Sequence, residues 1–337
     1  MRDGRDYHRL TVAAVIDETA DARSFVLEIP SALERRFAYV AGQFCTFRAT
    51  IGGESVARCY SMSSSPDMDD PFAVTVKRVP GGKMANWMHD TIRPGDTIEV
   101  MPPTGRFVLR PVETPIVAFA GGSGITPVVS IVKTALATTS REIKLVYANR
   151  RPGNVIFAAM IDRLRLESRG RFSVHHHLDS EKGFLDAAAC VALVGERTAA
   201  DFYICGPGPY MKVVQAGLDE CGVDASRLFI ERFELADKPS SSTESETESV
   251  VIRLERRKVV VKYEAGDTIH ETARRAGLKP PFACQAGECA TCMAHLVQGQ
   301  VTMRANNALN AEEVEQGWIL TCQAIPMSRE IVVDYDH

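Results

Sequence analysis

The chain has 337 residues, of which 45% are hydrophobic and 24% charged, and its formal net charge at pH 7 is -4. This length suits two or three ordinary globular domains. Acidic and basic residues are mixed along the chain, which argues against nucleic-acid and membrane partners. We see no signal peptide and no apolar run long enough to cross a membrane, so we expect a cytoplasmic protein and a monomer.

Short alternating segments separated by Gly, Pro and Asp turns characterise the first third of the chain. They predict an antiparallel β-barrel over residues 1–112, interrupted by one helix. The expected strands are Leu10 to Val15, Ser24 to Leu27, Gln43 to Ala49, Phe72 to Lys77 and Thr97 to Met101.

Two motifs in this region have the chemistry to bind a phosphate-bearing cofactor. Arg58-Cys59-Tyr60-Ser61 offers a guanidinium for phosphate, an aromatic face for stacking and a hydroxyl for hydrogen bonding. Alternating Arg and Tyr residues on a strand are more often an exposed side chain and a core ring. This motif alone therefore does not establish a cofactor site. The stretch Val76-Lys77-Arg78 leads through a glycine turn to Gly82-Lys83-Met84-Ala85, the start of a short helix suited to a pyrophosphate.

From about Pro115 the pattern alternates strands and helices, which predicts an α/β domain with a parallel sheet over residues 113–236. One strand runs into Gly121-Gly122-Ser123-Gly124-Ile125-Thr126-Pro127, where we expect Thr126 as the helix N-cap and Pro127 as the first helical residue. A second strand opens into Cys205-Gly206-Pro207-Gly208-Pro209-Tyr210-Met211. Each turn alone could be merely structural, but both are predicted at the carboxyl edge of one sheet, where such sheets bind ligands.

Arg150 follows a third predicted strand of this domain, Lys144 to Ala148. In an NAD(P) domain this position meets the adenosine ribose, and an arginine there accommodates the 2'-phosphate of NADPH. Exposed arginines are common on any surface. The sequence therefore leaves the choice between NADH and NADPH open.

Residues 237–249 contain no apolar side chain, so we expect a mobile linker. Residues 250–337 predict a small mixed sheet packed on one long helix. Val250 to Leu254 and Val259 to Tyr263 alternate as a hairpin. Helix caps are expected at Asp267 and Thr268 and, as a capping box, at Asn310 with Glu313.

Four cysteines form the most specific pattern. Cys284, Cys289 and Cys292 share one loop, Cys322 ends a short apolar strand, and this spacing matches the plant-type [2Fe-2S] pattern. The small residues between them let backbone N–H groups approach the sulfurs. Zinc usually takes two close ligand pairs, and the odd total of nine cysteines argues against disulfides. The remaining candidates are interpreted as structural: Cys45, Cys59, Cys190 and Cys221 as small apolar residues, and His175, His176 and His177 as strand residues on alternating faces.

The four loop motifs, in this order, resemble those of the ferredoxin-NADP+ reductase superfamily. With the cysteine pattern, the chain is similar to the reductases of bacterial multicomponent oxygenases, particularly those of 3-ketosteroid 9-alpha-hydroxylase, with those of phenylacetyl-CoA epoxidase as near relatives. The resemblance implies a multidomain fold: an antiparallel β-barrel for FAD, an α/β parallel sheet for NAD(P), and an α+β β-grasp ferredoxin.

The resemblance also implies roles for individual residues. Arg58 would contact the FAD phosphates, and Tyr60 and Ser61 the isoalloxazine. Gly82 to Ala85 would cradle the pyrophosphate, with Ala85 where many relatives have Ser. The residues implied to be catalytic are Ser61, Cys205 and Glu231. The full cofactor-binding set is Arg58, Cys59, Tyr60, Ser61, Val76, Lys77, Arg78, Gly82, Lys83, Met84, Ala85, Gly121, Gly124, Thr126, Pro127, Arg150, Cys205, Gly206, Pro207, Met211, Glu231 and Phe233, with Thr126 and Cys205 flanking the nicotinamide and Glu231 and Phe233 bordering the flavin.

The implied function is electron transfer from NADH or NADPH through FAD and the [2Fe-2S] cluster to a separate terminal oxygenase. A Rieske steroid hydroxylase is the first expectation for this partner and a di-iron epoxidase the second. A flavohaemoglobin-like enzyme would need a globin domain before the barrel, where only a few residues precede it. A non-enzymatic electron shuttle would leave both nucleotide loops without a purpose.

Overall fold

The computed structural model describes residues 7–233 and 246–337. The chain divides into two compact units, Met1–Glu234 and Leu235–His337, which we call the first and the second unit. Most of the predicted linker, residues 237–245, lies outside the described residues.

The end of the predicted linker belongs to the second unit, which corrects the expected boundary. The Thr247 hydroxyl donates a hydrogen bond to the carbonyl of Ser328 at 2.6 Å, and Ser249 is already a strand residue. Thr247 is held through its side chain and Ser249 through backbone pairing with Glu330, so both contact a segment that is distant in the sequence. The local composition, which lacks apolar residues, gave no sign of that pairing.

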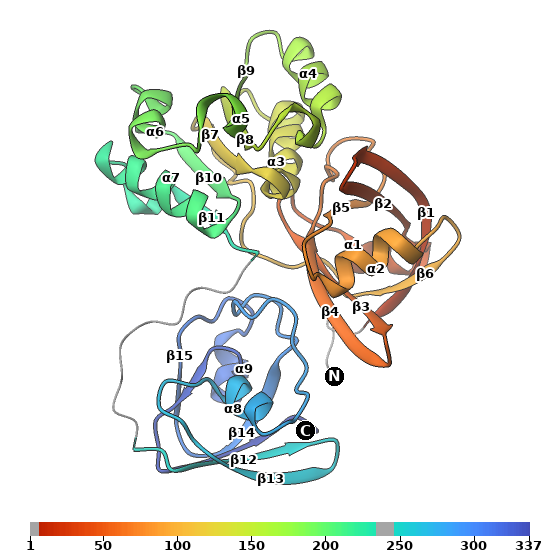
Figure 1. The fold of residues 1–337 in the computed structure, drawn as a ribbon, viewed down its shortest axis with the longest axis vertical. Helices are drawn as coiled ribbons and strands as arrows, with labels where there is room; N and C mark the ends of the chain where they lie inside the picture. The colour runs from red at the N-terminus through yellow and green to blue at the C-terminus, as the bar shows by residue number, and fades with distance from the viewer. Residues whose placement is uncertain (1–6, 234–245) are drawn as a thin grey trace. The chain divides into compact units, whose positions relative to one another are not determined.

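An antiparallel sheet of six strands forms the first part of the first unit (Figure 1). The strands are β1 His8–Thr19, β2 Ala22–Glu28, β3 Phe44–Ile51, β4 Glu54–Ser61, β5 Ala73–Lys77 and β6 Thr97–Val100, with helices α1 Glu34–Phe37 and α2 Lys83–Thr91 between them. Neighbouring strands follow the order β4-β3-β6-β1-β2-β5. Met62, just after β4, pairs with Val74 of β5, so the two edge strands meet and the sheet closes into the predicted barrel.

A parallel sheet of five strands forms the rest of the first unit. Its elements are β7 Ile116–Gly121, α3 Ile125–Thr138, β8 Ile143–Asn149, α4 Ala158–Glu167, β9 Phe172–Leu178, α5 Asp179–Lys182, α6 Ala187–Val194, β10 Asp201–Cys205, α7 Gly208–Glu220 and β11 Leu228–Glu231. The strand order is β11-β10-β7-β8-β9. β7 and β10 are therefore neighbours, and the loops after them leave the sheet at one edge, as the sequence predicted.

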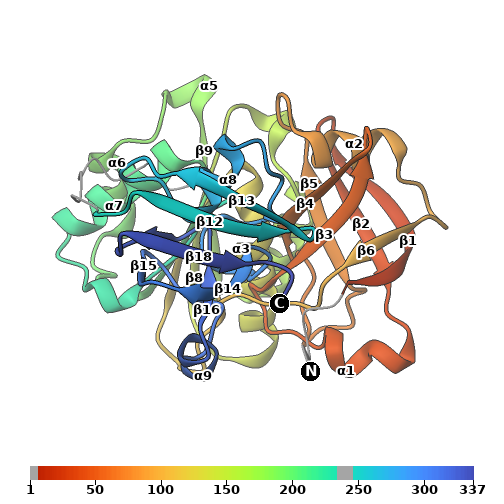
Figure 2. The same cartoon turned by 90° about the horizontal axis from the view of Figure 1, so that it is seen from below.

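Alternating side chains of the central strand face two separate cores. Ala118 and Ala120 of β7 pack with α3 and α4, whereas Val117 and Phe119 pack with α6 and α7. The helices thus cover both faces of the sheet, as Figures 1 and 2 show. This is the doubly wound arrangement that places ligands at the carboxyl ends of the strands.

The predicted N-cap at Thr126 is wrong. Residues Gly122–Gly124 form a single 3-10 turn that leads directly into α3, whose N-cap is Gly124. Gly122 has a φ of 53°, a left-handed conformation that glycine adopts without strain, and this turns the chain into the helix early. Thr126 and Pro127 consequently lie inside the first turn, where proline is tolerated because its missing N–H is not needed.

Residues 246–337 of the second unit form a mixed five-stranded sheet, a small two-stranded sheet and two short helices. Its elements are β12 Ser249–Leu254, β13 Arg257–Lys262, α8 Ile269–Arg275, β14 Met293–Gln298, β15 Val301–Met303, α9 Ala311–Glu315, β16 Trp318–Leu320, β17 Ala324–Pro326 and β18 Glu330–Asp334. The main sheet has the order β13-β12-β18-β14-β16, in which only β12 and β18 run parallel. The predicted multidomain fold is confirmed, although α8 is shorter than the long helix expected.

The caps predicted at Thr268 and Asn310 are both present in the second unit, each as a capping box. Thr268 accepts a hydrogen bond from the backbone N–H of Glu271, and the Glu271 side chain accepts one in return from the Thr268 N–H. Asn310 and Glu313 make the same reciprocal pair at α9. Asp267 does not cap the helix and instead receives a hydrogen bond from Arg275.

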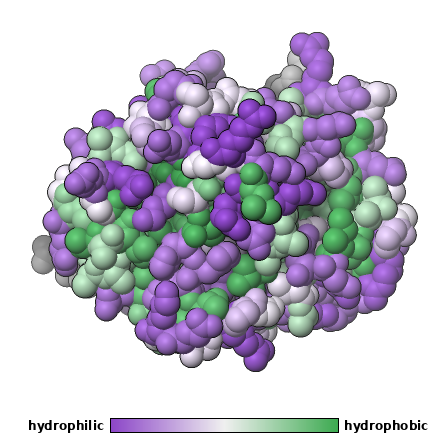
Figure 3. All heavy atoms as spheres, turned by 90° about the horizontal axis from the view of Figure 1, so that it is seen from above, coloured by the Kyte–Doolittle hydropathy of each residue, from purple (hydrophilic) through white to green (hydrophobic). Residues whose placement is uncertain are grey.

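The surface of the described residues is mixed in character. Figure 3 shows polar side chains over much of one face, with hydrophobic groups scattered among them. Within residues 7–233 and 246–337, the structure has no helix that is both long and apolar enough to cross a bilayer.

Candidate active site and iron-sulfur centre

The motif from Arg58 to Ser61 occupies the last four positions of β4. The Tyr60 ring packs edge-on against Phe47, with 5.5 Å between ring centroids, and is only partly buried. Arg58, also partly buried, donates to the neighbouring carbonyl of Ala57. The Ser61 hydroxyl is buried and has no hydrogen-bond partner among the described residues. A buried polar atom left unsatisfied in a well-packed barrel indicates a place where a ligand completes the hydrogen bonding.

The Gly82–Ala85 turn supplies backbone donors close to the same strand. α2 begins at Lys83 with Gly82 as its N-cap, no described side chain caps it, and the helix packs against β3 and β4. The N–H groups of its first turn therefore suit a pyrophosphate. The Ala85 side chain is buried in the barrel core, where the hydroxyl of a serine would have less access to a ligand.

Side chains at the end of β5 link the barrel to the parallel sheet. Lys77 Nζ lies 3.5 Å from Asp21 and 4.0 Å from the position that a β-carbon on Gly122 would take. Arg78 forms an ion pair with Asp90 on α2. The end of β5 thus lies beside the loop after β7, at the junction of the barrel and the parallel sheet.

The two loops at the carboxyl edge of the parallel sheet touch each other. A β-carbon on Gly206 would lie 3.1 Å from the Cα of Gly121, so neither position leaves room for a side chain between the loops. Gly121 and Gly206 therefore allow the loops after β7 and β10 to pack against each other, in addition to allowing a ligand to approach the backbone. Beside this contact, the buried Thr126 hydroxyl donates to the Ser123 carbonyl at 3.1 Å.

Cys205 and Glu231 lie directly opposite each other on the neighbouring strands β10 and β11. Burial and, secondarily, the negative charge of Glu231 raise the pKa of the Cys205 thiol well above its usual value. The thiol therefore stays neutral near pH 7 and offers a small polarizable surface, not a nucleophile. Phe233, two residues farther along, is 44% exposed.

Some predicted cofactor-binding residues turn their side chains away from this junction. Val76 and Met84 belong to the barrel core, and Met211 to the core beneath α7. These three residues could contact a cofactor only through their backbone. Arg150 is exposed immediately after β8, and Pro207 is the N-cap of α7.

The cysteine loop directs backbone donors at sulfur. Cys284 Sγ accepts hydrogen bonds from the N–H groups of Ala286 and Glu288, both at 3.4 Å, and Cys289 Sγ accepts one from the N–H of Cys284. Left-handed φ values at Gln285, 54°, and Gly287, 80°, fold the loop into this shape. Such N–H···S bonds stabilise thiolates that bind iron.

The four predicted ligands form two neighbouring pairs. Hydrogen bonding joins Cys284 to Cys289 and Cys292 to Cys322. No three His, Cys, Asp or Glu side chains of the described residues surround a single point at metal-binding distance. Two thiolates for each of two irons is the arrangement of a [2Fe-2S] cluster, so these residues fit that group better than one zinc ion.

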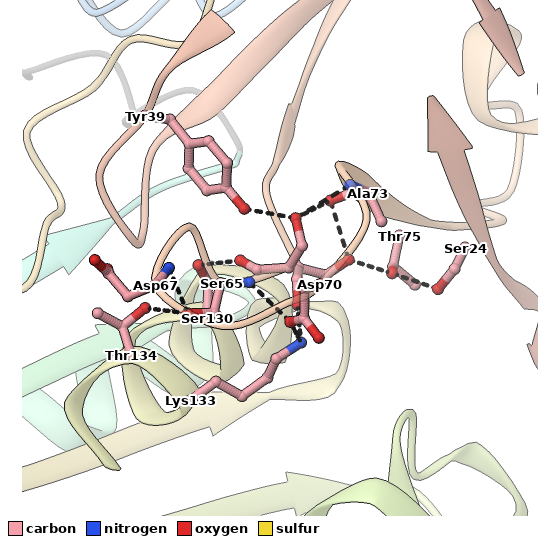
Figure 4. A network of polar contacts seen from close by, with 12 residues as sticks. Ser24, Tyr39, Ser65, Asp67, Asp70, Ala73, Thr75, Ser130, Lys133 and Thr134 are labelled. Carbon is pink, nitrogen blue, oxygen red and sulfur yellow. Dashed lines mark hydrogen bonds and ion pairs between the residues drawn. The ribbon is translucent and has the colours of Figure 1, made fainter. Parts of the chain in front are cut away.

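A polar network between the barrel and α3 was not found by sequence reasoning (Figure 4). It joins the serines at 63–65, which follow the Arg58 to Ser61 motif after Met62, to Ser130, Lys133 and Thr134 of α3. The run of three serines was the only signal in the sequence. Its partners Ser130, Lys133 and Thr134 lie on a helix that is more than 60 residues farther along the chain.

Known proteins match both units. Residues 9–109 match the oxidoreductase FAD-binding domain, 119–216 the oxidoreductase NAD-binding domain and 252–327 the 2Fe-2S iron-sulfur cluster binding domain. The ferredoxin reductase component of 3-ketosteroid-9-alpha-monooxygenase from Rhodococcus rhodochrous is 36% identical, over 97% of this chain and 96% of the relative. The chain belongs to the oxygenase reductases of the ferredoxin-NADP+ reductase superfamily.

Two further proteins show how widely this reductase architecture is shared. A component of the 1,2-phenylacetyl-CoA epoxidase from Escherichia coli K12 is 32% identical over 98% of both chains. The solved structure of phthalate dioxygenase reductase superposes with a TM-score of 0.61 at 25% identity, covering 97% of this chain and 98% of the other. This reductase is an NAD(P)H oxidoreductase that uses FAD and a [2Fe-2S] cluster.

Proposed function

We propose that this reductase passes electrons from NAD(P)H through FAD and its [2Fe-2S] cluster to a Rieske-type 3-ketosteroid 9-alpha-hydroxylase. The observation that carries the proposal is the 36% identity to the Rhodococcus rhodochrous steroid monooxygenase reductase across 97% of the chain. When bound, FAD supplies the conversion between two-electron exchange with nicotinamide and one-electron exchange with the cluster.

Within this proposal the chain's own residues bind and orient. Arg58 and the first turn of α2 would hold the flavin's phosphates, and the unsatisfied Ser61 hydroxyl would bond the polar edge of its ring. Thr126 and the neutral thiol of Cys205 would border the nicotinamide. Glu231, beside Cys205, would face the same junction. Little acid-base help is needed, because positioning dominates hydride transfer.

In the second unit, Cys284, Cys289, Cys292 and Cys322 would hold the two irons. The donors at Ala286 and Glu288 would tune the cluster's potential through Cys284. The buried thiols must lose protons when iron binds, so cluster loading is coupled to pH.

Reconstitution tests the choice of partner. The purified reductase is combined with NADH and the terminal oxygenase of a 3-ketosteroid 9-alpha-hydroxylase, and hydroxylated steroid is measured per NADH consumed. Tight coupling supports the proposal. NADH oxidation with an artificial acceptor but no steroid product would refute the steroid partner and leave the reductase activity intact.

A second partner is favoured by the match to the epoxidase component, which is 32% identical over 98% of the chain. The same assay with a di-iron phenylacetyl-CoA epoxidase and its substrate separates the two. Faster coupled turnover with the epoxidase would reverse the order of the candidates.

A further inference from the structure

The segment 63–65 leaves the end of β4 and lies on one face of α3. Ser130 Oγ donates a hydrogen bond to the Ser64 carbonyl at 2.6 Å, and the hydroxyls of Ser65 and Thr134 are also 2.6 Å apart. All four side chains are buried. Hydrogen bonds this short and this shielded from water fix the relative position of the two segments.

Lys133 of α3 takes part in this contact, and Figure 4 shows its nitrogen beside Asp70. Its residue is only 8% exposed, and its Nζ lies 2.6 Å from Asp70 and donates to the Ser63 carbonyl at 3.0 Å. Asp70 also accepts from the backbone N–H of Ser65. One buried ammonium therefore holds both ends of the loop 63–70, and lysine is buried in this way only when paired.

The same loop is bound just as firmly to the barrel. The hydroxyls of Ser63 and Thr75 are 2.8 Å apart, and those of Tyr39 and Ser64 are 2.7 Å apart. The loop therefore moves with the barrel strands on one side and with α3 on the other.

The two ends of this connection are the two halves of the candidate active site. Ser61 lies two residues before the loop, and α3 begins directly after the glycine turn and carries Thr126 in its first turn. Hydride transfer requires the reacting atoms to lie about 3 to 3.5 Å apart, and an error of 1 Å costs on the order of 10²-fold in rate. Such a narrow range of distances requires a rigid connection between the flavin half and the nicotinamide half of the candidate active site.

We propose that Lys133, with Asp70, is a positioning residue that sets the distance between the flavin held at Ser61 and the nicotinamide held at the start of α3. Lys133 acts through the loop 63–70, not by contact with the reacting atoms. The inference rests on the cofactor positions proposed above. It does not depend on which oxygenase receives the electrons.

The test compares Lys133→Met with the wild-type holoenzyme in the absence of any oxygenase. Stopped-flow absorbance gives the rate of flavin bleaching at saturating NADH, deuterated NADH gives the isotope effect on that rate, and FAD content and NADH affinity are measured separately. Amide hydrogen exchange, which needs no turnover, reports the rigidity of residues 62–70 and of α3.

We expect bleaching to slow roughly 10- to 100-fold, with a larger isotope effect, while FAD content and NADH affinity change less than about twofold. Exchange should quicken in the loop and in α3 together. Lys133→Arg, which keeps the charge, should recover part of the rate. An unchanged rate, or a loss of rate that only mirrors loss of FAD, would overturn the proposal.

If Lys133→Met fails to fold, a matched pair of threonine variants tests whether the contact between α3 and the loop 63–70 positions the cofactors. Thr134→Val removes a hydroxyl that joins α3 to Ser65 of the loop, whereas Thr138→Val removes one that donates to the Thr134 carbonyl within α3 itself. The proposal requires Thr134→Val to slow bleaching and Thr138→Val to leave it near the wild-type rate. Equal effects would mean that the hydroxyls contribute only to general stability.

Discussion

A β-carbon on Gly124 would lie 2.1 Å from the carbonyl oxygen of Cys205. Side chains do not approach backbone so closely, so the loops after β7 and β10 can meet only with glycine at this position. Gly124→Ala should lower the free energy of unfolding by about 1–3 kcal/mol and raise the KM for NADH, because the loops must separate. Thermal unfolding and steady-state kinetics measure both effects.

The matched control for this change is Gly153→Ala. An added β-carbon there would meet nothing within 4 Å, and the backbone is not left-handed. This control should shift stability by less than about 0.5 kcal/mol. Equal behaviour of the two variants would contradict the close contact between the loops.

Removing the Ser61 hydroxyl should separate catalysis from stability. The Oγ atom has no partner within the described residues, so Ser61→Ala should not destabilise the FAD-free protein. If the hydroxyl bonds the flavin, reduction by NADH should slow by on the order of 10²-fold. Ser55→Ala, an exposed serine of the same strand, serves as control. Full-speed flavin reduction in Ser61→Ala would remove Ser61 from the catalytic set.

Loss of one cluster ligand should abolish electron transfer to external acceptors but leave the reduction of the flavin by NADH unaffected. Cys322→Ser is expected to lose bound iron and the reduction of one-electron acceptors such as cytochrome c, while NADH still bleaches the flavin. Cys221→Ser, at the end of α7, should keep its iron. Iron analysis and visible absorbance provide the measurement. Because a serine oxygen can also bind iron, only retention of the cluster with unchanged visible absorbance in Cys322→Ser would exclude Cys322 as a ligand.

Arg150 and Arg151 provide an internal comparison for cofactor choice. Both follow β8, but Arg151 Nε donates to Asn154, whereas Arg150 is expected to meet the 2'-phosphate. Arg150→Ala should raise the KM for NADPH roughly 10-fold, the value of one charge-assisted contact, and leave that for NADH unchanged. Arg151→Ala should change neither. If Arg150→Ala has the same KM as the wild type for NADPH and also for NADH, this result would argue for NADH as the natural electron donor.

Burial of His270 makes the stability of the second unit depend on pH. Burial, with the positive charge of Arg274, lowers the pKa of His270 from 6.5 to about 4. Between these values the unfolded chain binds more protons, so the unfolding free energy falls as the pH falls from 6.5 toward 4, by up to about 3 kcal/mol.

His270→Leu should remove most of this slope. Neither ring nitrogen has a hydrogen-bond partner among the described residues, so the variant should be at least as stable as the wild type at pH 7. The chain has two tryptophans. Urea unfolding in a Trp87→Phe background lets Trp318 fluorescence report on the second unit alone. Parallel pH profiles for the variant and its parent would show that His270 does not titrate as described.

Local signals in the sequence predicted local structure well. The capping boxes at Thr268 and Asn310 depend on residues three positions apart, and both are present. The cysteine loop depends on spacing within nine residues, and its N–H···S bonds follow from it. The start of α3 was misplaced because a glycine turn and a threonine cap are equally good local beginnings, and only the neighbouring loop decides between them.

Contacts between distant segments were beyond sequence reasoning. Lys133 lies on a helix where a charged residue predicts an exposed face, yet it is buried against Ser63 and Asp70. Its partners are fixed by how the barrel packs on the parallel sheet. A related limit applies to Val76, Met84 and Met211, which were predicted to bind a cofactor although their side chains lie in the cores. A sequence motif does not reveal which of its side chains turn into the core.

The pairing of β12 with β18 has a consequence for biogenesis. β12 is the first strand of the second unit's main sheet in chain order, but it lies inside that sheet, between β13 and β18. One edge of β12 therefore stays unpaired until β18 has left the ribosome. Cys322 also emerges only shortly before β18. Iron should therefore enter the protein only after Cys322 has been synthesised, and chains cut short before β18 should expose an unpaired edge of β12 and be prone to aggregation.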